Sequence, residues 1–332
     1  MRAVGYRHSR PISEPDALED LELPVPAPGP RDLLVDVRAV AVNPVDTKVR
    51  MRTDPGGEPK VLGWDAAGVV VGAGAEVSLF APGDEVYYAG SVARAGCDSE
   101  RHVVDERIVG RKPRILSFPE AAALPLTSIT AWECLFDRLR LDAGSTGTLL
   151  VLGGAGGVGS ILVQLARVLT GVTVIATASR PESQRWVRDL GAHHVVDHTA
   201  DLVRQVEEIA PGGVDHVFTA YSTGREQDLA AVVRPQGQIV AIDDPDGFDV
   251  RALKQKSIGF LWESMFTRPV FGTDDLVEQH RLLDRVADLV DAGALRTTLT
   301  RTMSGLTAAN VVEAHRLLES HRVTGKIVID LD

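Results

Sequence analysis

A run of glycines between an apolar stretch and an amphipathic segment constrains the fold of this chain more than any other feature. The run is Gly153-Gly154-Ala155-Gly156-Gly157-Val158-Gly159, and it follows the apolar residues 148–152. Apolar residues then recur at helical spacing through 158–169, and residues 172–177 form a second apolar stretch. This order predicts a strand, a tight turn, a helix and a second strand, which together form a unit that binds a dinucleotide.

The physical basis of that prediction lies in the glycines at 154, 156 and 159, which match G-x-G-x-x-G. They permit a tight turn and let backbone N–H groups approach a pyrophosphate at the N-terminus of a helix. We therefore expect cofactor contacts from Gly154, Ala155, Gly156, Gly157 and Val158. The alternative is a glycine-rich loop that serves only close packing between strand and helix.

The pattern along the rest of the chain predicts two domains, as does its length of 332 residues at roughly 150 residues per domain. From residue 147 onward strands alternate with helices, and further strands are expected at 195–196, 214–219 and 238–242. Such alternation is typical of a parallel sheet covered by helices on both faces. The first third has short apolar runs broken by glycine and proline, which indicates an irregular β-structure such as a small barrel. Other expected elements are a strand at 33–40, helices at 120–123, 129–139, 274–292 and 307–319, and a last strand at 326–331.

Charge and cysteine content exclude several classes of function. There are 35 Lys and Arg against 46 Asp and Glu, so the net charge is −11, which disfavours binding to nucleic acid or to anionic membranes. No apolar run approaches the roughly 18 residues of a membrane span, and the start MRAVGYRHSR lacks the apolar core of a signal peptide. Two cysteines, Cys97 and Cys134, are too few for a disulfide framework. We expect a cytoplasmic protein that acts on a small molecule.

The end of the second strand distinguishes the two nicotinamide dinucleotides. Proteins that bind NAD usually place Asp or Glu there, to hold the ribose hydroxyls. Here the strand ends Ala176-Thr177-Ala178-Ser179-Arg180, without an acid. Ser179 can donate to a phosphate and Arg180 can clamp one, which predicts NADPH rather than NADH. The alternative for Arg180 is a solvated surface side chain.

Several motifs along the chain point to one family. In order, they are Asn43-Pro44-Val45-Asp46, Leu62-Gly63-Trp64-Asp65-Ala66-Ala67-Gly68, Pro82-Gly83-Asp84-Glu85-Val86, Leu126-Thr127-Ser128-Ile129-Thr130-Ala131 and Thr324-Gly325-Lys326-Ile327-Val328. With this ordered set the chain resembles the medium-chain dehydrogenase/reductase superfamily, and within it the zinc-free, quinone oxidoreductase-like branch.

The resemblance implies an α/β chain with two domains. A GroES-like irregular β-barrel catalytic domain is expected from residues 1–118 and 266–332, with an inserted Rossmann domain, a doubly wound parallel sheet, at 119–265. The ligand site would lie in the cleft between the two domains. Relatives commonly pair through a sheet edge of the Rossmann domain, which implies a homodimer, and residues 259–262 are apolar enough to be such a strand or to line the cleft.

Zinc ligands can be checked one position at a time. A catalytic zinc needs about three protein ligands, typically Cys, His and an acid. Where zinc-dependent relatives carry the cysteine and the histidine, this chain has Asn43 and Trp64, and it lacks the four cysteines of a structural zinc lobe. We therefore expect no metal. Without a Lewis acid alcohol oxidation is difficult, whereas hydride transfer from NADPH to a quinone or an enone remains accessible.

The remaining site residues come from the same resemblance. Asn43 is expected near the nicotinamide, where it would donate to the acceptor's oxygen or hold the cofactor; the alternative is an ordinary turn residue. Lys48 is a candidate for charge stabilisation or proton supply, against a solvated lysine. Asp65 is expected to form structural hydrogen bonds rather than act as an acid.

Three further positions match cofactor contacts of the family, and each has a structural alternative. Thr130 is either such a contact or a helix-interior threonine bonded to a carbonyl. His198 lies beside the adenine or is an exposed loop histidine. Lys326 approaches the cofactor or is solvated at the start of its strand.

The predicted function is therefore zinc-free hydride transfer from NADPH to a quinone-like acceptor. Two alternatives remain open at this point. One is an NADPH-dependent enone or alkenal reductase, and the other is an NADPH-binding protein without physiological turnover.

Overall fold

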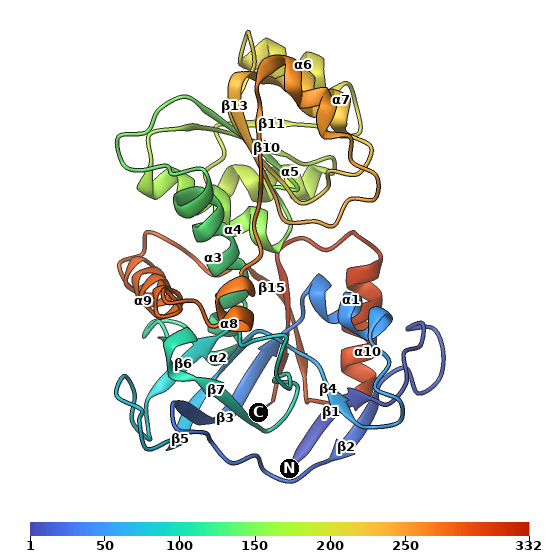
Figure 1. Cartoon of the computed structure of the whole chain (residues 1–332), viewed down its shortest axis with the longest axis vertical. Helices are drawn as coiled ribbons and strands as arrows, with labels where there is room; N and C mark the ends of the chain where they lie inside the picture. The colour runs from blue at the N-terminus through green and yellow to red at the C-terminus, as the bar shows by residue number, and fades with distance from the viewer. Residues whose placement is uncertain (332) are drawn as a thin grey trace. The chain divides into compact units, whose positions relative to one another are not determined.

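The computed structural model describes residues 1–331, and the chain divides into two compact units (Figure 1). The first unit contains Met1–Ile129 together with the chain from Phe266 onward, and the second contains Thr130–Met265. The second unit is thus inserted into the first. Residues 119–129, which the sequence assigns to the nucleotide-binding domain, belong to the first unit.

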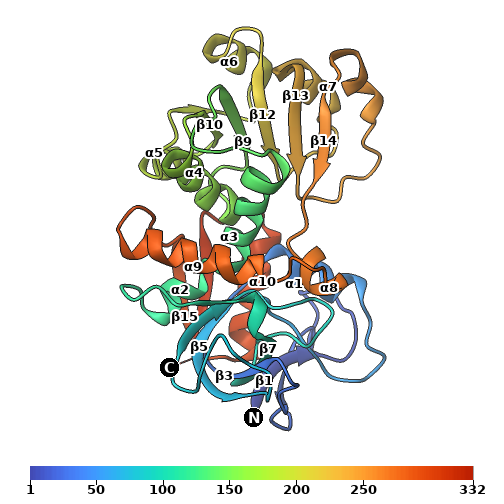
Figure 2. The same ribbon diagram turned by 60° about the vertical axis from the view of Figure 1, so that its left-hand side comes forward.

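The second unit is built on a six-stranded sheet in the order β11-β10-β9-β12-β13-β14, and every neighbouring pair is parallel. Figure 2 shows these strands side by side. The strand order reverses between β9 and β12, which is the arrangement of a doubly wound sheet, as predicted. Its strands are β9 (Thr148–Leu152), β10 (Thr173–Thr177), β11 (His194–Val196), β12 (Val214–Thr219), β13 (Val233–Ala241) and β14 (Gly259–Trp262).

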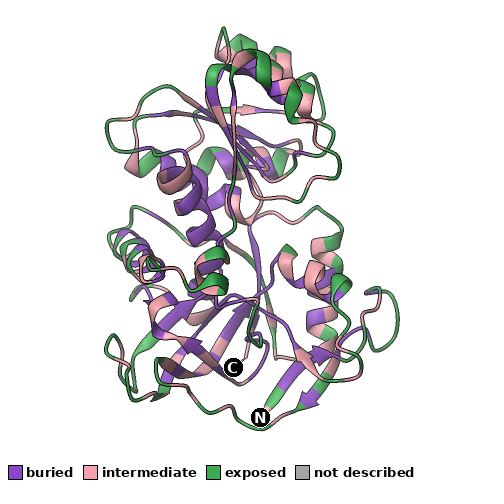
Figure 3. Ribbon diagram, viewed as in Figure 1, coloured by how far each residue is buried: buried purple, intermediate pink, exposed green. Residues whose placement is uncertain are grey.

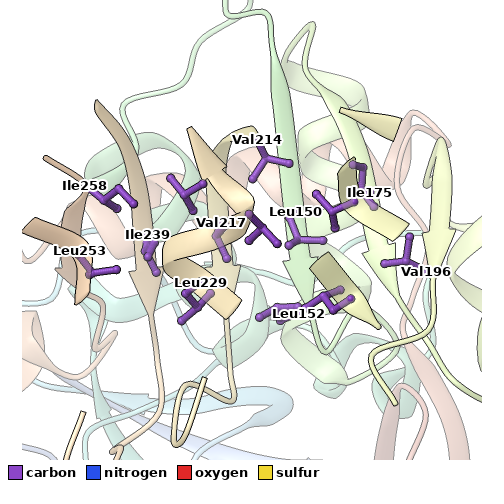
Figure 4. Packing of buried hydrophobic residues seen from close by; sticks show 14 residues of the cluster. Leu150, Leu152, Ile175, Val196, Val214, Val217, Leu229, Ile239, Leu253 and Ile258 are labelled. Carbon is purple, nitrogen blue, oxygen red and sulfur yellow. The ribbon is translucent and has the colours of Figure 1, made fainter. Parts of the chain in front are cut away.

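The helices of the second unit pack on these strands. Helix α4 contacts β9 and β10, and α7 contacts β13. A cluster of aliphatic side chains from the strands, including Leu150, Ile175, Val217 and Ile239, fills one side of the sheet (Figure 4). The helical elements are α4 (Gly157–Leu169), α5 (Pro181–Asp189), α6 (Leu202–Ile209), α7 (Glu226–Val232), η3 (Val250–Lys256) and the π-helical turn η2 (Glu133–Arg138) that continues α3 (Pro125–Trp132).

The first unit contains two sheets. A three-stranded sheet has the order β2-β1-β4, and a seven-stranded sheet has the order β15-β16-β3-β5-β6-β8 with β7 on β3. Within residues 1–331 this strand path does not return to its start, so the expected barrel is an open mixed sheet instead of a closed one. The strands are β1 (Arg2–Tyr6), β2 (Glu19–Glu22), β3 (Asp32–Ala41), β4 (Lys60–Val61), β5 (Ala66–Ala73), β6 (Glu85–Tyr88), β7 (Arg101–Asp105), β8 (Val109–Arg111), β15 (Leu299–Ser304) and β16 (Lys326–Asp330).

Both ends of the chain contribute to the first unit. Strand β16, red in Figure 1, pairs antiparallel with β3, which is blue. The helices of this unit are α1 (Pro44–Arg52), η1 (Glu106–Ile108), α2 (Phe118–Ala122), α8 (Thr267–Phe271), α9 (Glu278–Asp291) and α10 (Ala308–Glu319). Helix α10 contacts α1, and α9 contacts β8. In Figure 3 the strands at the centre of each unit are largely purple, while outward helix faces are green.

Two predicted strands, at 148–152 and 214–219, have the bounds that the sequence indicates, and residues 259–262, which the sequence left as a strand or as cleft lining, form β14. The sequence predicts no helix at residues 44–52, where a turn is only the alternative role of Asn43, and helix α1 there is a finding of the structure. No helix in residues 1–331 is both long and apolar enough to cross a bilayer.

Candidate functional site

The glycine loop of the second unit has the backbone geometry of a dinucleotide-binding turn. Gly153 has a positive φ of 81°, a conformation that favours glycine. Its N–H donates to Thr177 Oγ1 at 3.0 Å, which joins the end of β9 to the end of β10. Gly156 lies directly before α4 and forms its N-cap, so the first N–H groups of the helix face outward from the loop.

The glycines of the loop differ in how much space an added Cβ would have. A Cβ at Gly159 would lie 2.3 Å from the carbonyl oxygen of Gly153, and one at Gly154 would lie 2.9 Å from the Cβ of Ala176. These two glycines serve close packing of helix and strands. A Cβ at Gly156 would meet only the Gly153 oxygen, at 3.4 Å, so packing within the protein does not demand a glycine there. An open glycine at a helix N-terminus is what close approach of a pyrophosphate requires, and the loop therefore fits a dinucleotide.

The carboxyl ends of β12 and β13 adjoin this loop at the point where the strand order reverses, which is where ligands bind in such sheets. Tyr221, just after β12, is 54% exposed, and its ring edge would lie 3.0 Å from a Cβ at Gly153. Ser222 donates through both its N–H and its hydroxyl to the carboxylate of Asp243, at 2.6 and 2.9 Å. Asp243 is therefore engaged by Ser222, a contact that the sequence did not reveal because 21 residues separate the two.

Ser179 and Arg180 lie after β10, as predicted. Both are partly exposed, and Arg180 is the N-cap residue of α5. Its Nε lies 3.4 Å from Glu182 Oε1. This acid, two residues on, lowers the net positive charge that Arg180 can offer to a phosphate.

His198 follows β11 and is partly buried. Burial lowers the pKa of its imidazole, and the positive charge of Arg225 lowers the pKa further. The ring is therefore neutral at neutral pH, which suits stacking on a base better than contact with a phosphate.

In the first unit three predicted residues form one buried cluster. The ammonium of Lys326 donates to Asp65 Oδ2 at 2.8 Å, to the carbonyl of Val42 at 3.1 Å and to Asn43 Oδ1. Asn43 Nδ2 donates to Asp65 Oδ2 at 3.2 Å and to the carbonyl of Ala41 at 3.3 Å. The Asn43, Asp65 and Lys326 side chains, called the Asn43 cluster below, are all at most 3% exposed.

The elements of the first unit explain how these residues meet. Asn43 lies between β3 and α1, Asp65 immediately precedes β5, and Lys326 begins β16. Because β3 pairs with both β5 and β16, the three positions lie at one end of the sheet. Asp65 also accepts from the Leu126 N–H at 3.0 Å, which confirms the expectation of structural hydrogen bonds. Lys326 is buried, so the solvated alternative for this lysine was wrong.

Two further buried acids lie near this cluster, and the sequence analysis assigned neither of them a role. Asp46 accepts from the backbone N–H of Asn43 at 2.5 Å. Asp98 is 1% exposed, and its Oδ1 has no hydrogen-bond partner among residues 1–331. Burial raises the pKa of Asp98 to about 7. Burial, and then the charge of Asp98, raise the pKa of Asp46 well above its usual range.

The other predicted residues have less defined roles. Lys48 lies on α1 and is partly exposed, and Thr130 is buried within α3. Lys48 and the Asn43 cluster belong to the first unit, whereas Thr130, the glycine loop, Arg180 and His198 belong to the second. The predicted site residues are thus divided between the two units, and only Asn43, Asp65 and Lys326 form one hydrogen-bonded cluster.

Comparison with known proteins identifies the family. Residues 29–125 match an alcohol dehydrogenase GroES-like domain, and residues 190–329 match a zinc-binding dehydrogenase domain. A zinc-type alcohol dehydrogenase-like protein from Staphylococcus epidermidis is 38% identical over the whole of both chains. A quinone oxidoreductase from Pseudomonas aeruginosa is 31% identical over 95% of this chain and 96% of its own length. A 2-methylene-furan-3-one reductase from Solanum lycopersicum is 31% identical over 96% of this chain and 74% of its own.

A solved structure agrees with these sequence relatives. It is a Rhizobium etli protein provisionally named a zinc-dependent alcohol dehydrogenase, with a TM-score of 0.97 and 54% identity over 99% of this chain and 98% of that one. The chain therefore belongs to the medium-chain dehydrogenase/reductase superfamily. Within that superfamily it is an oxidoreductase, similar both to zinc-type alcohol dehydrogenase-like proteins and to quinone oxidoreductases.

The names of several relatives include zinc, and the residues of the Asn43 cluster do not fit that metal. The ammonium of Lys326 lies 2.8 Å from the Asp65 carboxylate, and such a charge would repel a divalent cation. Trp64, which stands where relatives have a histidine ligand, is 1% exposed and donates its indole N–H to Ser91 at 2.9 Å. Within residues 1–331 no group of His, Cys, Asp and Glu side chains is arranged to hold a metal ion.

Proposed function

We propose that this protein transfers hydride from NADPH to a quinone-like acceptor without the help of zinc. The observation that carries the proposal is the Lys326–Asp65 ion pair, which is hydrogen-bonded to Asn43 in the motif that the resemblance places at a ligand position of zinc-dependent relatives. With no Lewis acid to lower the pKa of an alcohol, the accessible chemistry is reduction of an acceptor that is already polarised. Quinones and enones are such acceptors, because the arriving charge is delocalised onto oxygen.

The second unit supports the cofactor part of the proposal. The loop from Gly153 to Val158 would hold the pyrophosphate through its N–H groups, and Arg180 would hold the 2′-phosphate. When bound, the nicotinamide supplies the hydride. The protein then has to orient the acceptor, exclude water and offer hydrogen bonds.

The acceptor class can be tested with purified protein. Initial rates with NADPH would be measured against a panel of quinones and a panel of enones and alkenals. We expect quinones to be reduced with the higher kcat/KM. Higher efficiency with enones would favour the second candidate, which the similarity to the 2-methylene-furan-3-one reductase supports. NADPH binding without oxidation by either panel would favour a binding protein without turnover.

The expected absence of zinc can be measured directly. Protein purified without added metal would be analysed for zinc by mass spectrometry, and kcat would be measured before and after treatment with a chelator. We expect less than one zinc per chain and unchanged turnover. One tightly held zinc per chain would overturn the zinc-free proposal.

Arg180 tests the preference for NADPH. Loss of an arginine–phosphate contact costs about 1.5–3 kcal/mol, which corresponds to roughly ten-fold or more in kcat/KM. Arg180→Ala should therefore lower kcat/KM for NADPH by that factor and leave the value for NADH nearly unchanged. Arg185→Ala, an exposed arginine on the same helix, is the matched control. An equal loss with both cofactors would refute the assignment.

We also propose a homodimer paired through β14. This strand is the last in the sheet order, and its Trp262 is 54% exposed. Light scattering should give twice the chain mass, and Trp262→Lys should shift the population towards monomer, because a charge on an edge strand opposes pairing. A wild-type monomer at micromolar concentration would contradict this proposal.

A further inference from the structure

The orientation of the Asn43 amide is fixed by the chemistry of its partners. An ammonium carries only hydrogens, so the atom of Asn43 that contacts Lys326 must be the oxygen. A carboxylate carries only acceptors, so the atom that contacts Asp65 Oδ2 at 3.2 Å must be the nitrogen. A flipped amide would set N–H against N–H and oxygen against oxygen, and both contacts would become repulsive.

Both hydrogens of the Asn43 nitrogen are directed at protein acceptors. One faces Asp65 Oδ2 and the other faces the Ala41 carbonyl at 3.3 Å. The Asn43 oxygen accepts from Lys326, and a carbonyl oxygen has a second lone pair. Asn43 therefore has no donor left for a ligand.

We infer that Lys326 and Asp65 are positioning residues that hold the Asn43 amide with its N–H groups turned to the protein, so that Asn43 has no N–H to offer a ligand. This inference rests on the proposed function, because it treats Asn43 as a ligand-facing residue. The sequence left open whether Asn43 donates to the acceptor's oxygen or holds the cofactor, and this inference excludes the first of these roles. A quinone or an enone carries only accepting oxygens, so Asn43 is not the donor that stabilises the acceptor's developing charge.

The burial of the cluster makes this orientation costly to change. Lys326 is 3% exposed and Asp65 is fully buried, so neither side chain can turn to water. Asp65 is held further by the Leu126 N–H, at 3.0 Å, and Lys326 by the Val42 carbonyl, at 3.1 Å. To donate to a ligand, Asn43 would have to leave Asp65 or Ala41 with an unfilled acceptor in a dry site.

The experiment uses a property of the composition. The chain has two asparagines, Asn43 and Asn310. Protein made with ¹⁵N-labelled asparagine side chains therefore gives two NH₂ signals, and Asn310→Gln identifies which one belongs to Asn310. Asn310 Nδ2 donates to Ser304 and Gly305, each at 2.8 Å, in a partly exposed position, and it reports whether the fold is intact.

Two measurements on wild-type protein decide the inference. The Asn43 NH₂ hydrogens should exchange with solvent on the order of 100-fold more slowly than those of a free amide, because both are bonded in a buried site. When a 1,4-naphthoquinone is added to the NADP⁺ complex, the chemical shifts of the two Asn43 NH₂ protons should change no more than those of Asn310. Fast exchange, or a downfield shift of one Asn43 proton on adding quinone, would overturn the inference.

Variants then separate the positioning role from a general structural one. Lys326→Met with Asp65→Asn removes both charges together, which avoids leaving one buried charge alone. In this double variant we expect hydrogen exchange at Asn43 to rise at least ten-fold while exchange at Asn310 is unchanged. In the single variant Lys326→Arg, which keeps the positive charge, Asn43 should retain part of its protection. An unchanged Asn43 signal in the double variant would mean that this pair does not position the amide. These signals require no turnover, so they remain informative even if the proposed reductase activity fails.

Discussion

Asp98 should make the stability of the first unit depend on pH near neutrality. Its side chain is 1% exposed, and its Oδ1 has no partner among residues 1–331. Burial raises its pKa from 3.8 to about 7. Below pH 3.8 the carboxyl is protonated in both the folded and the unfolded chain. Between pH 3.8 and about 7 only the folded chain keeps the proton, so the free energy of unfolding falls as pH rises.

The size of this effect follows from the pKa difference. Each pH unit in that window corresponds to about 1.4 kcal/mol, so the total loss approaches about 4 kcal/mol. Asp98→Asn removes the titration and keeps nearly the same shape. The variant should therefore gain stability over the wild type between pH 5 and pH 7 by about 3 kcal/mol. The pKa of Asp46 depends in part on Asp98, so the measured difference belongs to the pair of acids.

The assay is urea unfolding at pH 5, 6, 7 and 8, followed by tryptophan fluorescence in a background with Trp132, Trp186 and Trp262 replaced by Phe, which leaves Trp64 as the probe of the first unit. Asp274→Asn, which replaces an exposed aspartate of the same unit, is the matched control for the loss of one carboxylate. If the Asp98→Asn difference is independent of pH, the buried-acid reasoning is refuted.

Three other predictions concern the second unit. Gly159→Ala should lower the stability of the second unit by about 1–3 kcal/mol in thermal unfolding, because the added carbon would lie 2.3 Å from the carbonyl oxygen of Gly153. Gly156→Ala should unfold as the wild type does but bind NADPH more weakly in a fluorescence titration. Burial and the neighbouring Glu133 raise the pKa of Glu263 to about 9, although Arg138, 2.6 Å away, lowers it. The wild type should therefore lose stability as pH rises from 4.5 towards about 9, and Glu263→Gln should remove that loss. A stability difference between variant and wild type that is the same at pH 6 and pH 9 would contradict this. Ser160→Ala should cost about 1–3 kcal/mol in urea unfolding, because Trp186 Nε1 then loses an acceptor at 2.8 Å; an unchanged midpoint would show that the bond contributes nothing.

The second unit was the more predictable of the two. Strands such as β9 and β12 are short apolar runs bounded by turn residues, and the glycine loop ties one of them to a helix within a few residues. Local sequence therefore determines most of this unit. The π-helical turn at Glu133–Arg138 is an exception, because nothing in its composition distinguishes it from an ordinary helix end.

The first unit depends on contacts between distant residues, which a single sequence does not reveal. Lys326 resembles a solvated lysine at a strand start until β16 pairs with β3 and brings it to Asp65. Asp98 carries no motif, and its burial follows from packing against Gly63, where an added Cβ would meet its Oδ1 at 2.3 Å. Whether the sheet closes into a barrel is likewise decided by strand pairing and not by local pattern.

The insertion of one unit into the other has a consequence for synthesis. Asp65 and Lys326 are separated by 261 positions, and translation proceeds at about 5–20 residues per second, so their ion pair must wait about 10 to 50 seconds after Asp65 is made. During that interval the inserted unit can complete its own sheet on the ribosome, whereas the surrounding unit still lacks β15 and β16. A nascent chain that stalls before residue 326 would therefore carry a finished nucleotide-binding unit and an unpaired Asp65. Such a product would lack the Lys326–Asp65 ion pair, and it would be open to proteolysis in the unit that contains both ends of the chain.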